Sequence, residues 1–279
     1  MRHVLSVDVE DWFQVGAFEA VIDKSDWNSL EPRVERNTDA VLALFAESGV
    51  KATFFTLGWV GQRNPALIRR IVDSGHELAS HGWDHQRVFT MDAATFRADL
   101  DRTRKTLEDA GGVGVSGYRA PSFSIDQRTP WAHSVLADEG YTYSSSVAPV
   151  RHDHYGWPEA PRFAFRPVKG AELVEVPVTY ASLAGRRLVA GGGFFRVFPA
   201  ALTDLAIKQV ASAWQPAIFY FHPWDMDPMQ PRVTNASLRS KLRHYTRLGA
   251  MENKLRALIG RYDWGRMDAA VSVARTKWQ

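Results

Sequence analysis

Short apolar runs of strand length recur along this chain. Residues 3–9 alternate apolar and polar side chains and are rich in β-branched types, a pattern typical of a strand. The predicted strands occupy residues 3–9, 51–57, 77–79, 115–118, 172–178 and 217–221. Residues 149–171, rich in proline, glycine and scattered aromatics, are interpreted as an ordered loop.

Longer segments between these runs carry apolar residues at helical spacing. The clearest is residues 91–110, with Phe96, Leu100, Thr103 and Leu107 on one face. The other predicted helices occupy residues 33–48, 65–74, 130–139 and 199–214, with two basic helices after residue 235. Strands and helices alternate throughout, which predicts one α/β domain built on a largely parallel sheet or barrel.

The composition suits a globular chain of 279 residues with ample material for a core, because 45% of the residues are hydrophobic and 23% are charged. The absence of cysteine excludes disulfides and any Cys-ligated zinc. The apolar run after Met1 is interrupted at Asp8, too soon for a signal peptide, and no apolar run is long enough to span a membrane. We therefore expect a cytoplasmic protein with no nucleic-acid partner.

Positive charge is concentrated late in the chain. Residues 232–261 hold eight Lys or Arg against Glu252 alone, whereas the net charge of the whole chain is only +3. Two interpretations remain open: a solvated helical face, or a patch for an anionic partner such as phospholipid headgroups, which would make the protein membrane-peripheral, or an acidic glycan. We expect a main domain over residues 1–230 and a basic helical C-terminal extension over residues 231–279 that packs on it.

Four polar clusters follow predicted strands. They comprise residues 8–11, residues 81–85, Arg119 and His222. Parallel α/β architectures gather their chemistry at the carboxyl ends of strands, so these clusters are expected to form one site. Glycines 191–193, beside two phenylalanines, are either a plain turn or a close approach to ligand.

His81 and His85 are four residues apart, which places both rings on one side of a helical or tightly turned segment. Two such imidazoles can converge on one metal ion, and a hydrolytic metal site adds a carboxylate and an open position for water. The cluster at residues 8–11 supplies three carboxylates, which are costly to place together unless a cation or a shared proton relieves them. The alternative is that the two histidines lie in a polar surface loop.

The ordered clusters resemble the polysaccharide deacetylase family of carbohydrate esterases, the NodB-like group. Residues 75–85 (GHELASHGWDH) are similar to its H-[ST]-x-x-H motif, residues 117–121 (GYRAP) to its arginine motif, and residues 219–222 (FYFH) to its late L-x-H motif. The match runs from residue 4 to about residue 225. Each motif alone is weak, but these three in order, together with the carboxylate cluster at residues 8–11, are strong.

A subgroup resemblance rests on SVDVEDWF, GGGFFR and FHPW at residues 6–13, 191–196 and 221–224. These are similar to deacetylases found with bacterial exopolysaccharide (exosortase-system) loci, which also carry a basic C-terminal extension. The implied fold is a single-domain, distorted (β/α) barrel of about seven strands.

The resemblance implies a metal-dependent hydrolase that removes N-acetyl groups from hexosamine units of a polysaccharide or its precursor, releasing acetate. The implied cofactor is a divalent metal, expected to be Zn²⁺, with Co²⁺, Mn²⁺ or Fe²⁺ as alternatives. One other hypothesis keeps the site but acts on a cyclic amide or ureide. Another is an inactive glycan-binding module.

The roles implied for the reaction are Asp8 as base, Arg119 as the residue that holds Asp8, and His222 as acid. The implied metal ligands are His81, His85 and Glu10, with Asp11 as the competing carboxylate; strand parity places Asp8 and Glu10 on one face. The residues expected to contact substrate are Trp12, Pro121, Phe194 and Trp224.

The chain departs from the family pattern in three places. The first motif has Asp8, Glu10 and Asp11 in place of two adjacent aspartates, and Gly82 replaces the hydroxyl residue that follows the first histidine. The Trp and Asp of the fourth motif are not evident near residues 143–146, so the residue that tunes the acid is open, with Asp225 as a candidate.

Overall fold

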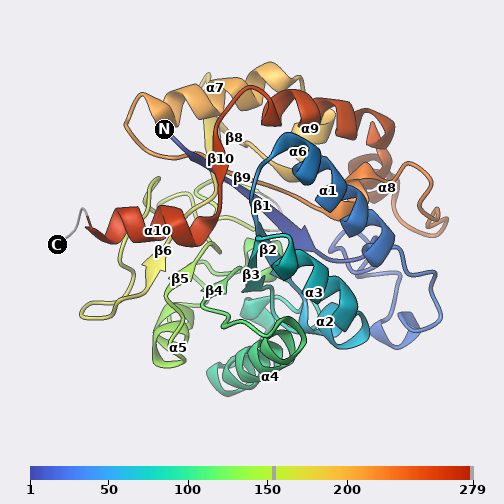
Figure 1. Cartoon of the computed structure of the whole chain (residues 1–279), viewed down its shortest axis with the longest axis horizontal. Coiled ribbons are helices and arrows are strands. Elements are labelled where there is room, and N and C mark those ends of the chain that lie inside the picture. The colour runs from blue at the N-terminus through green and yellow to red at the C-terminus, as the bar shows by residue number, and fades with distance from the viewer. Residues whose placement is uncertain (153–154, 277–279) are drawn as a thin grey trace.

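The computed structural model describes residues 1–152 and 155–276, which fold into a curled parallel sheet surrounded by helices (Figure 1). The strands are β1 (His3–Val9), β2 (Thr53–Thr56), β3 (Glu77–Ser80), β4 (Gly117–Tyr118), β5 (Tyr143–Ser144), β6 (Val174–Glu175), β7 (Tyr180–Leu183), β8 (Arg186–Val189), β9 (Ile218–Phe221) and β10 (Trp264–Gly265). The sheet has the order β10-β1-β2-β3-β4-β5-β6, and β9 also pairs with β1.

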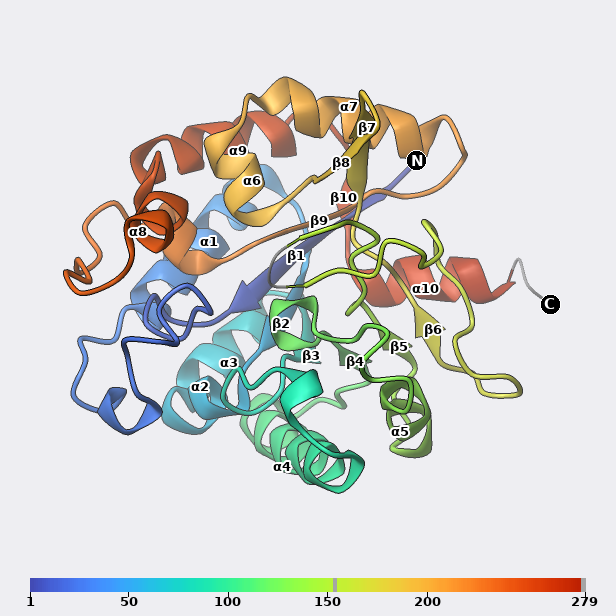
Figure 2. The same cartoon turned by 180° about the vertical axis from the view of Figure 1, so that it is seen from behind.

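Helices cover the outside of the sheet, as the two opposite views show (Figures 1 and 2). They are α1 (Val34–Ser48), α2 (Gly58–Arg63), α3 (Pro65–Asp73), α4 (Ala93–Gly111), α5 (Ala132–Asp138), α6 (Gly192–Val197), α7 (Ala200–Ala211), α8 (Leu238–Tyr245), α9 (Met251–Ile259) and α10 (Met267–Thr276). Short 3-10 turns occupy Lys24–Asp26, Val88–Thr90, Pro121–Phe123, Pro223–Met226 and Leu248–Ala250.

Strand β1 occupies the middle of the sheet, in parallel register with β2 on one side and β9 on the other. Its odd-numbered residues Leu5, Val7 and Val9 join the core cluster that also holds the buried face of α1. Its even-numbered residues therefore face the inside of the barrel, where Ser6 and Asp8 are buried. Along residues 5–9 the period-two pattern thus sends apolar side chains to the helices and polar ones to the interior, whereas Val4 joins a second apolar cluster.

The two best-patterned helices form as the sequence predicts. In α4 the residues Phe96, Leu100, Thr103 and Leu107 are all buried, and the helix ends at Gly112 in the left-handed conformation (φ +69°). Only glycine adopts that conformation without strain, which explains the stop. Helix α1 ends in the same way at Gly49.

The sheet confirms the predicted α/β barrel, with one strand more than expected. Residues 231–276 contribute not only helices α8, α9 and α10 but also β10, which pairs with the first residues of β1. Strands β6 and β9 do not pair with each other, but Thr179 bridges the gap because its backbone N–H donates to the Ile218 carbonyl at 3.2 Å. The division at residue 230 stays a prediction.

Three elements differ from the sequence pattern. An antiparallel hairpin of β7 and β8 forms a separate two-stranded sheet that was not predicted, and α2 is a further unpredicted helix. The turn expected at glycines 191–193 is confined to its start, because Gly191 lies in a bend and α6 begins at Gly192, which has φ +55°. Glycine's low helix propensity is overridden there by the packing of α6 against β9, which has no room for larger residues at its start.

The basic C-terminal segment is tied to the rest of the chain. Lys254 donates to backbone carbonyls at residues 195, 196 and 198, Arg256 pairs with Glu47 and Glu252, and Arg261 pairs with Asp204. These contacts favour a solvated, structural face over a free patch. Within residues 1–152 and 155–276, no helix is long and apolar enough to cross a membrane.

Candidate active site

A cavity of about 220 Å³ lies at the carboxyl ends of the central strands. Its lining includes Asp8 and Glu10 from the end of β1, His81 from the end of β3 and His222 from the end of β9. His85, from the loop after β3, also lines it. The structure thus brings together residues from opposite ends of the chain, as the strand-end argument predicts.

Glu10, His81 and His85 each offer one ligand atom, and these atoms lie within 4.8 Å of one another. Within residues 1–152 and 155–276 this is the one cluster of His and carboxylate groups with such geometry. All three side chains are at least nine-tenths buried. The predicted His-His-Glu set is therefore present as a candidate metal site.

His81 is held in the tautomer that a metal ligand needs. Its Nδ1 lies 2.8 Å from the backbone carbonyl of Arg119, which can only accept, so Nδ1 carries the proton and Nε2 keeps its lone pair. Burial lowers the pKa of His81 to about 4, despite the opposing charges of Asp8 and Glu10. A neutral, oriented imidazole is the form that binds a metal ion.

The Glu10 carboxylate has one oxygen engaged and one free of hydrogen bonds. Its Oε1 accepts from Trp224 Nε1 at 3.1 Å, whereas Oε2 is buried and accepts no aligned hydrogen bond, although it lies 2.8 Å from His85 Nε2. Burial by itself raises the pKa of Glu10, but the nearby imidazoles outweigh it and lower that pKa below the usual range. A buried, orphaned carboxylate oxygen beside two imidazoles fits a divalent cation.

The loop between the two histidines explains why Gly82 replaces a hydroxyl residue. Gly82 has φ +75°, and a Cβ there would lie 3.2 Å from Asp99 Oδ2. Asp99 accepts from the Trp83 N–H at 3.0 Å and so fixes the loop from α4. His85 itself is in the left-handed region (φ +60°), a strained conformation that the tight turn imposes on a ligand residue.

Asp11 does not join the candidate metal ligands. One of its oxygens accepts from the Trp12 N–H, and the other accepts from the N–H groups of Arg33 and Val34 at 2.7 and 3.0 Å, where α1 begins. Burial raises the pKa of Asp11 to about 6 in spite of these bonds. Its side chain satisfies the orphan donors of a helix N-terminus, which is a structural position.

Asp8 is fixed by the fully buried Arg119. Arg119 Nη1 lies 2.6 Å from Asp8 Oδ1 and 2.8 Å from Ser6 Oγ, while its Nε and Nη2 donate to the backbone oxygen and hydroxyl of Ser145. The guanidinium also lies over the Phe55 ring, 4.0 Å from its centroid. The charge-assisted pair holds the Asp8 carboxylate in one orientation beside the metal ligands.

His222 lies on the other flank of Glu10. Its Nε2 is 3.6 Å from Glu10 Oε1, and its Nδ1 is 3.0 Å from Asp225 Oδ2. Burial disfavours the charged ring, but the carboxylates of Glu10, Asp225 and Asp8 outweigh burial and raise the pKa of His222 to about 9. Asp225 is thus one of the groups that raise the pKa of His222, and its role as the tuning residue stays a prediction.

Only one of the four residues expected to contact substrate lines the cavity. Trp224 does, and its indole stacks on His222 with ring centroids 4.8 Å apart. Trp12 is buried in the apolar cluster that also holds Trp224 and donates to the Glu31 carbonyl, and Phe194 stacks on Phe198. Pro121 is buried and does not line the cavity, although its neighbours at residues 122 and 123 do. Trp12 and Phe194 are both packed against neighbouring aromatic side chains, and their contact with substrate stays a prediction.

Sequence reasoning missed several residues at the cavity. Ser122 and Phe123 line it with φ of +53° and +49°, and Arg196 and His244 line it as well. Arg196 ends the GGGFFR segment, which the family resemblance had singled out without a role. His244 lies in the basic tail, where no local pattern distinguishes it from a surface residue.

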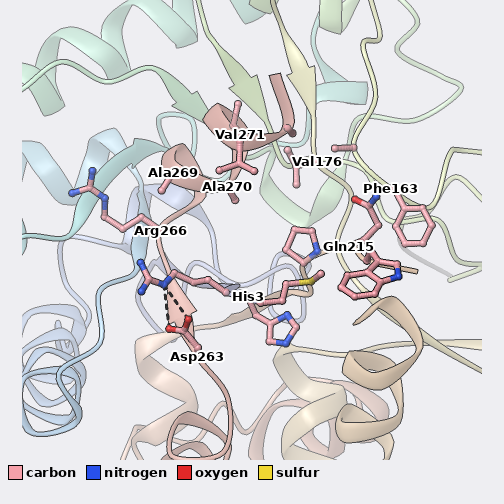
Figure 3. Close-up of a pocket in the computed structure, with 16 residues that line it drawn as sticks. His3, Phe163, Val176, Gln215, Asp263, Arg266, Ala269, Ala270 and Val271 are labelled. Atoms are coloured by element: carbon pink, nitrogen blue, oxygen red, sulfur yellow. Dashed lines mark hydrogen bonds and ion pairs between the residues drawn. The ribbon is translucent and has the colours of Figure 1, made fainter. Parts of the chain in front are cut away.

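A larger cavity of about 420 Å³ lies at the other end of the barrel, between α10 and the start of β1 (Figure 3). Its carboxylate, Asp263, is paired with Arg2, and the Nδ1 of His3 accepts from the Ala217 N–H at 3.0 Å. The remaining lining is mostly alanine, valine and aromatic side chains. These residues supply no metal ligands and no acid–base pair, so the smaller cavity is the candidate active site.

Comparisons with known proteins agree with this assignment. Residues 24–144 match the family model described as polysaccharide deacetylase, and residues 145–272 match a domain of unknown function, DUF3473. The peptidoglycan-N-acetylglucosamine deacetylase of Listeria monocytogenes is 31% identical over 91 residues, which are 33% of this chain and 20% of the relative. Chitin deacetylase 1 of Cryptococcus neoformans is 27% identical over 142 residues, which are 48% of this chain and 30% of the relative.

Solved structures share the whole fold at low identity. A Mycobacterium smegmatis structure described as a polysaccharide deacetylase superposes with a TM-score of 0.63 at 21% identity, covering 99% of this chain and 90% of the other. The Puue allantoinase structure gives 0.59 at 15% identity, with 96% and 88% covered. These likenesses establish the barrel fold.

Proposed function

The chain belongs to the polysaccharide deacetylase family, and we propose that it removes N-acetyl groups from hexosamine units of a polysaccharide or its precursor, releasing acetate. The observation that carries this proposal is one cavity that holds an Arg-fixed carboxylate, a His-His-Glu cluster and an Asp-fixed histidine. Amide hydrolysis needs a base for the attacking water and an acid for the leaving amine.

We propose that Glu10, His81 and His85 hold a divalent metal ion, and that zinc is the first candidate because two imidazoles and one carboxylate are its usual hydrolytic ligand set. Co²⁺, Mn²⁺ and Fe²⁺ remain alternatives for the same ligands. When bound there, such an ion lowers the pKa of bound water and polarises the scissile carbonyl.

The protein residues carry the two proton transfers. Asp8, oriented by Arg119, takes a proton from the attacking water. His222 delivers a proton from Nε2 to the leaving amine, since its Nδ1–H is held by Asp225 and Nε2 lies beside Glu10. Trp224 keeps the imidazole plane fixed by stacking on it.

A panel of substrates tests the proposal. Purified protein is loaded with one equivalent of Zn²⁺ and assayed for acetate release from N-acetylated glucosamine oligomers and peptidoglycan fragments, and for hydrolysis of a cyclic ureide. Acetate release, abolished by chelation and restored by metal, is the expected result. Hydrolysis of the ureide alone would replace the proposed substrate class, and glycan binding with no release by the loaded protein would favour an inactive module.

The partner and the cellular location of the protein are not shown by the structure. An N-acetylated glycan is the proposed partner. Cytoplasmic location stays a prediction, and the membrane or anionic partner of the basic segment has no support, because six of its eight basic residues contact groups within the chain.

A further inference from the structure

The two oxygens of Asp225 have separate partners. Oδ2 accepts from both the backbone N–H and the ring Nδ1–H of His222, each at 3.0 Å. Oδ1 lies 3.0 Å from Arg196 Nη1 in an ion pair whose two side chains are completely buried, although neither atom makes an aligned hydrogen bond. The carboxylate is thus held between the imidazole and one guanidinium.

Arg196 reaches this position because α6 begins directly against β9. A Cβ on Gly191 would lie 2.4 Å from the backbone oxygen of Tyr220, and one on Gly192 would lie 2.9 Å from the Tyr220 ring. The helix start is therefore pressed onto the strand that ends at His222. One further contact fixes the guanidinium, since Nη2 donates to the carbonyl of Arg243 in α8.

A buried ion pair of this kind is weak evidence for stability. Removing two charges from water is costly, and well-packed apolar residues of similar volume are often as stable. Burial indeed lowers the pKa of Arg196, and the Asp225 charge only partly opposes this. The pair is better explained by orientation, because it places a buried cation at Oδ1 of Asp225 while Oδ2 faces His222.

A second restraint on His222 is aromatic stacking by residues that follow it in the chain. The Trp224 indole lies between His222 and His244, with centroids 4.8 and 4.3 Å away and rings tilted by 13° and 16°. His244 is fixed in turn, because its Nε2 lies 2.6 Å from Gln230 Oε1. Two independent restraints therefore act on the same imidazole, one on its edge and one on its face.

We propose that Arg196 is a positioning residue for the acid of the reaction: it holds Oδ1 of Asp225 so that Oδ2 stays on Nδ1–H of His222 and Nε2 points into the cavity. The residues that match DUF3473, 145–272, therefore build the acid half of the active site. The role of His222 as the acid rests on the proposed deacetylase function. The Arg196–Asp225–His222 arrangement is testable without that function.

Kinetic coupling is the first test. Arg196→Met, Asp225→Asn and the double variant are assayed for acetate release, bound metal and thermal unfolding. We expect Arg196→Met to lower kcat about 10–100-fold with KM within about twofold and metal content unchanged. In the Asp225→Asn background the same change should cost less than about threefold, because the residue it acts through is already lost. Arg196→Lys, which keeps the charge, should recover most of the loss.

The control is Arg256→Met, which removes an exposed arginine of α9 that pairs with Glu47 and Glu252 and should leave kcat unchanged. Wild-type kcat in Arg196→Met, or a full additive loss in the double variant, would overturn the inference. A merely structural role would instead lower the unfolding temperature and active fraction together in both backgrounds.

A second measurement does not need turnover. Solvent exchange of the His222 Nδ1–H proton, followed by NMR, should accelerate at least about tenfold in Arg196→Met, because the accepting carboxylate is no longer held. If the wild type releases no acetate from any glycan, the proposed function fails and this exchange rate alone decides the role of Arg196. Unchanged exchange in the variant would exclude it.

Discussion

Glu77 allows a quantitative prediction of how stability depends on pH. The side chain is buried on β3, where Oε1 accepts from Tyr143 OH at 2.7 Å and Oε2 accepts from Thr53 Oγ1 at 2.5 Å and from the Asp268 N–H at 3.0 Å. Burial, with the neighbouring Asp268 charge, raises the pKa of Glu77 to about 7 from 4.5. The hydrogen bonds oppose this shift without cancelling it.

The sign follows from proton binding. Between pH 4.5 and 7 the folded state holds the Glu77 proton while the unfolded state has released it, so this group's contribution to the free energy of unfolding falls as pH rises. A difference of about 2.5 pKa units corresponds to about 3 kcal/mol, lost mainly between pH 5 and 7 and constant above that. Glu77→Gln imitates the protonated side chain and should remove this dependence.

Urea unfolding at pH 5, 6, 7 and 8 measures the effect. Relative to wild type, Glu77→Gln should become more stable as pH rises, by up to about 3 kcal/mol between pH 5 and 8. Comparing the two proteins cancels the other titrating groups. Glu47→Gln, which changes an exposed carboxylate on α1, should run parallel to wild type. Parallel curves for Glu77→Gln and wild type would refute a raised Glu77 pKa.

Four further changes test the site and its scaffold. His81→Ala should reduce bound metal from about one per chain to near zero, measured by elemental analysis, and full metal content would remove His81 from the ligands. Asp8→Asn should keep the metal but lower acetate release at least about 10²-fold, and normal release would place the base elsewhere. His222→Ala should lower kcat by about 10² to 10⁴-fold with metal retained; an unchanged kcat would assign the acid to another group. Gly191→Ala places a Cβ 2.4 Å from a β9 carbonyl and should cost about 1–3 kcal/mol in urea unfolding, whereas Gly114→Ala, which meets nothing within 4 Å, should be neutral.

The alternation of residues along β1 is the pattern that best predicted the candidate site. Alternation along residues 3–9 predicts that Asp8 and Glu10 share a face, and the structure places both at the cavity while Asp11 lies at the start of α1. The strand-end argument predicted that the cluster at residues 8–11 and His222 lie in one site, and the register of β9 against β1 places these two strand ends side by side. Local patterns suffice there because one face of each strand is buried against helices.

Packing between distant segments was not predictable. Arg196 acquires its position from contacts of α6 with β9 and α8, and nothing in the local sequence encodes those contacts. Trp12 shows the converse problem. An aromatic side chain beside catalytic carboxylates is typical of a sugar-binding wall, yet this indole completes an apolar cluster with Phe13 and Trp27.

The central place of β1 affects how the protein reaches its folded state during synthesis. One edge of β1 pairs with β2, which is near in sequence, but the other pairs with β9, and the Ser6 hydroxyl donates to a carbonyl 213 residues away. The ribosome therefore synthesises Asp8, Glu10 and both candidate metal-binding histidines long before β9, which pairs with the second edge of β1, emerges.

Until then β1 exposes an unpaired edge and its apolar faces, and pairings of such long sequence separation form slowly. Partly folded chains of this kind aggregate readily, which makes the interval before β9 docks the vulnerable period of biogenesis. A fragment that ends before residue 217 would keep the His-His-Glu cluster in its sequence but leave this edge open, so we expect it to form inclusion bodies and not a smaller deacetylase.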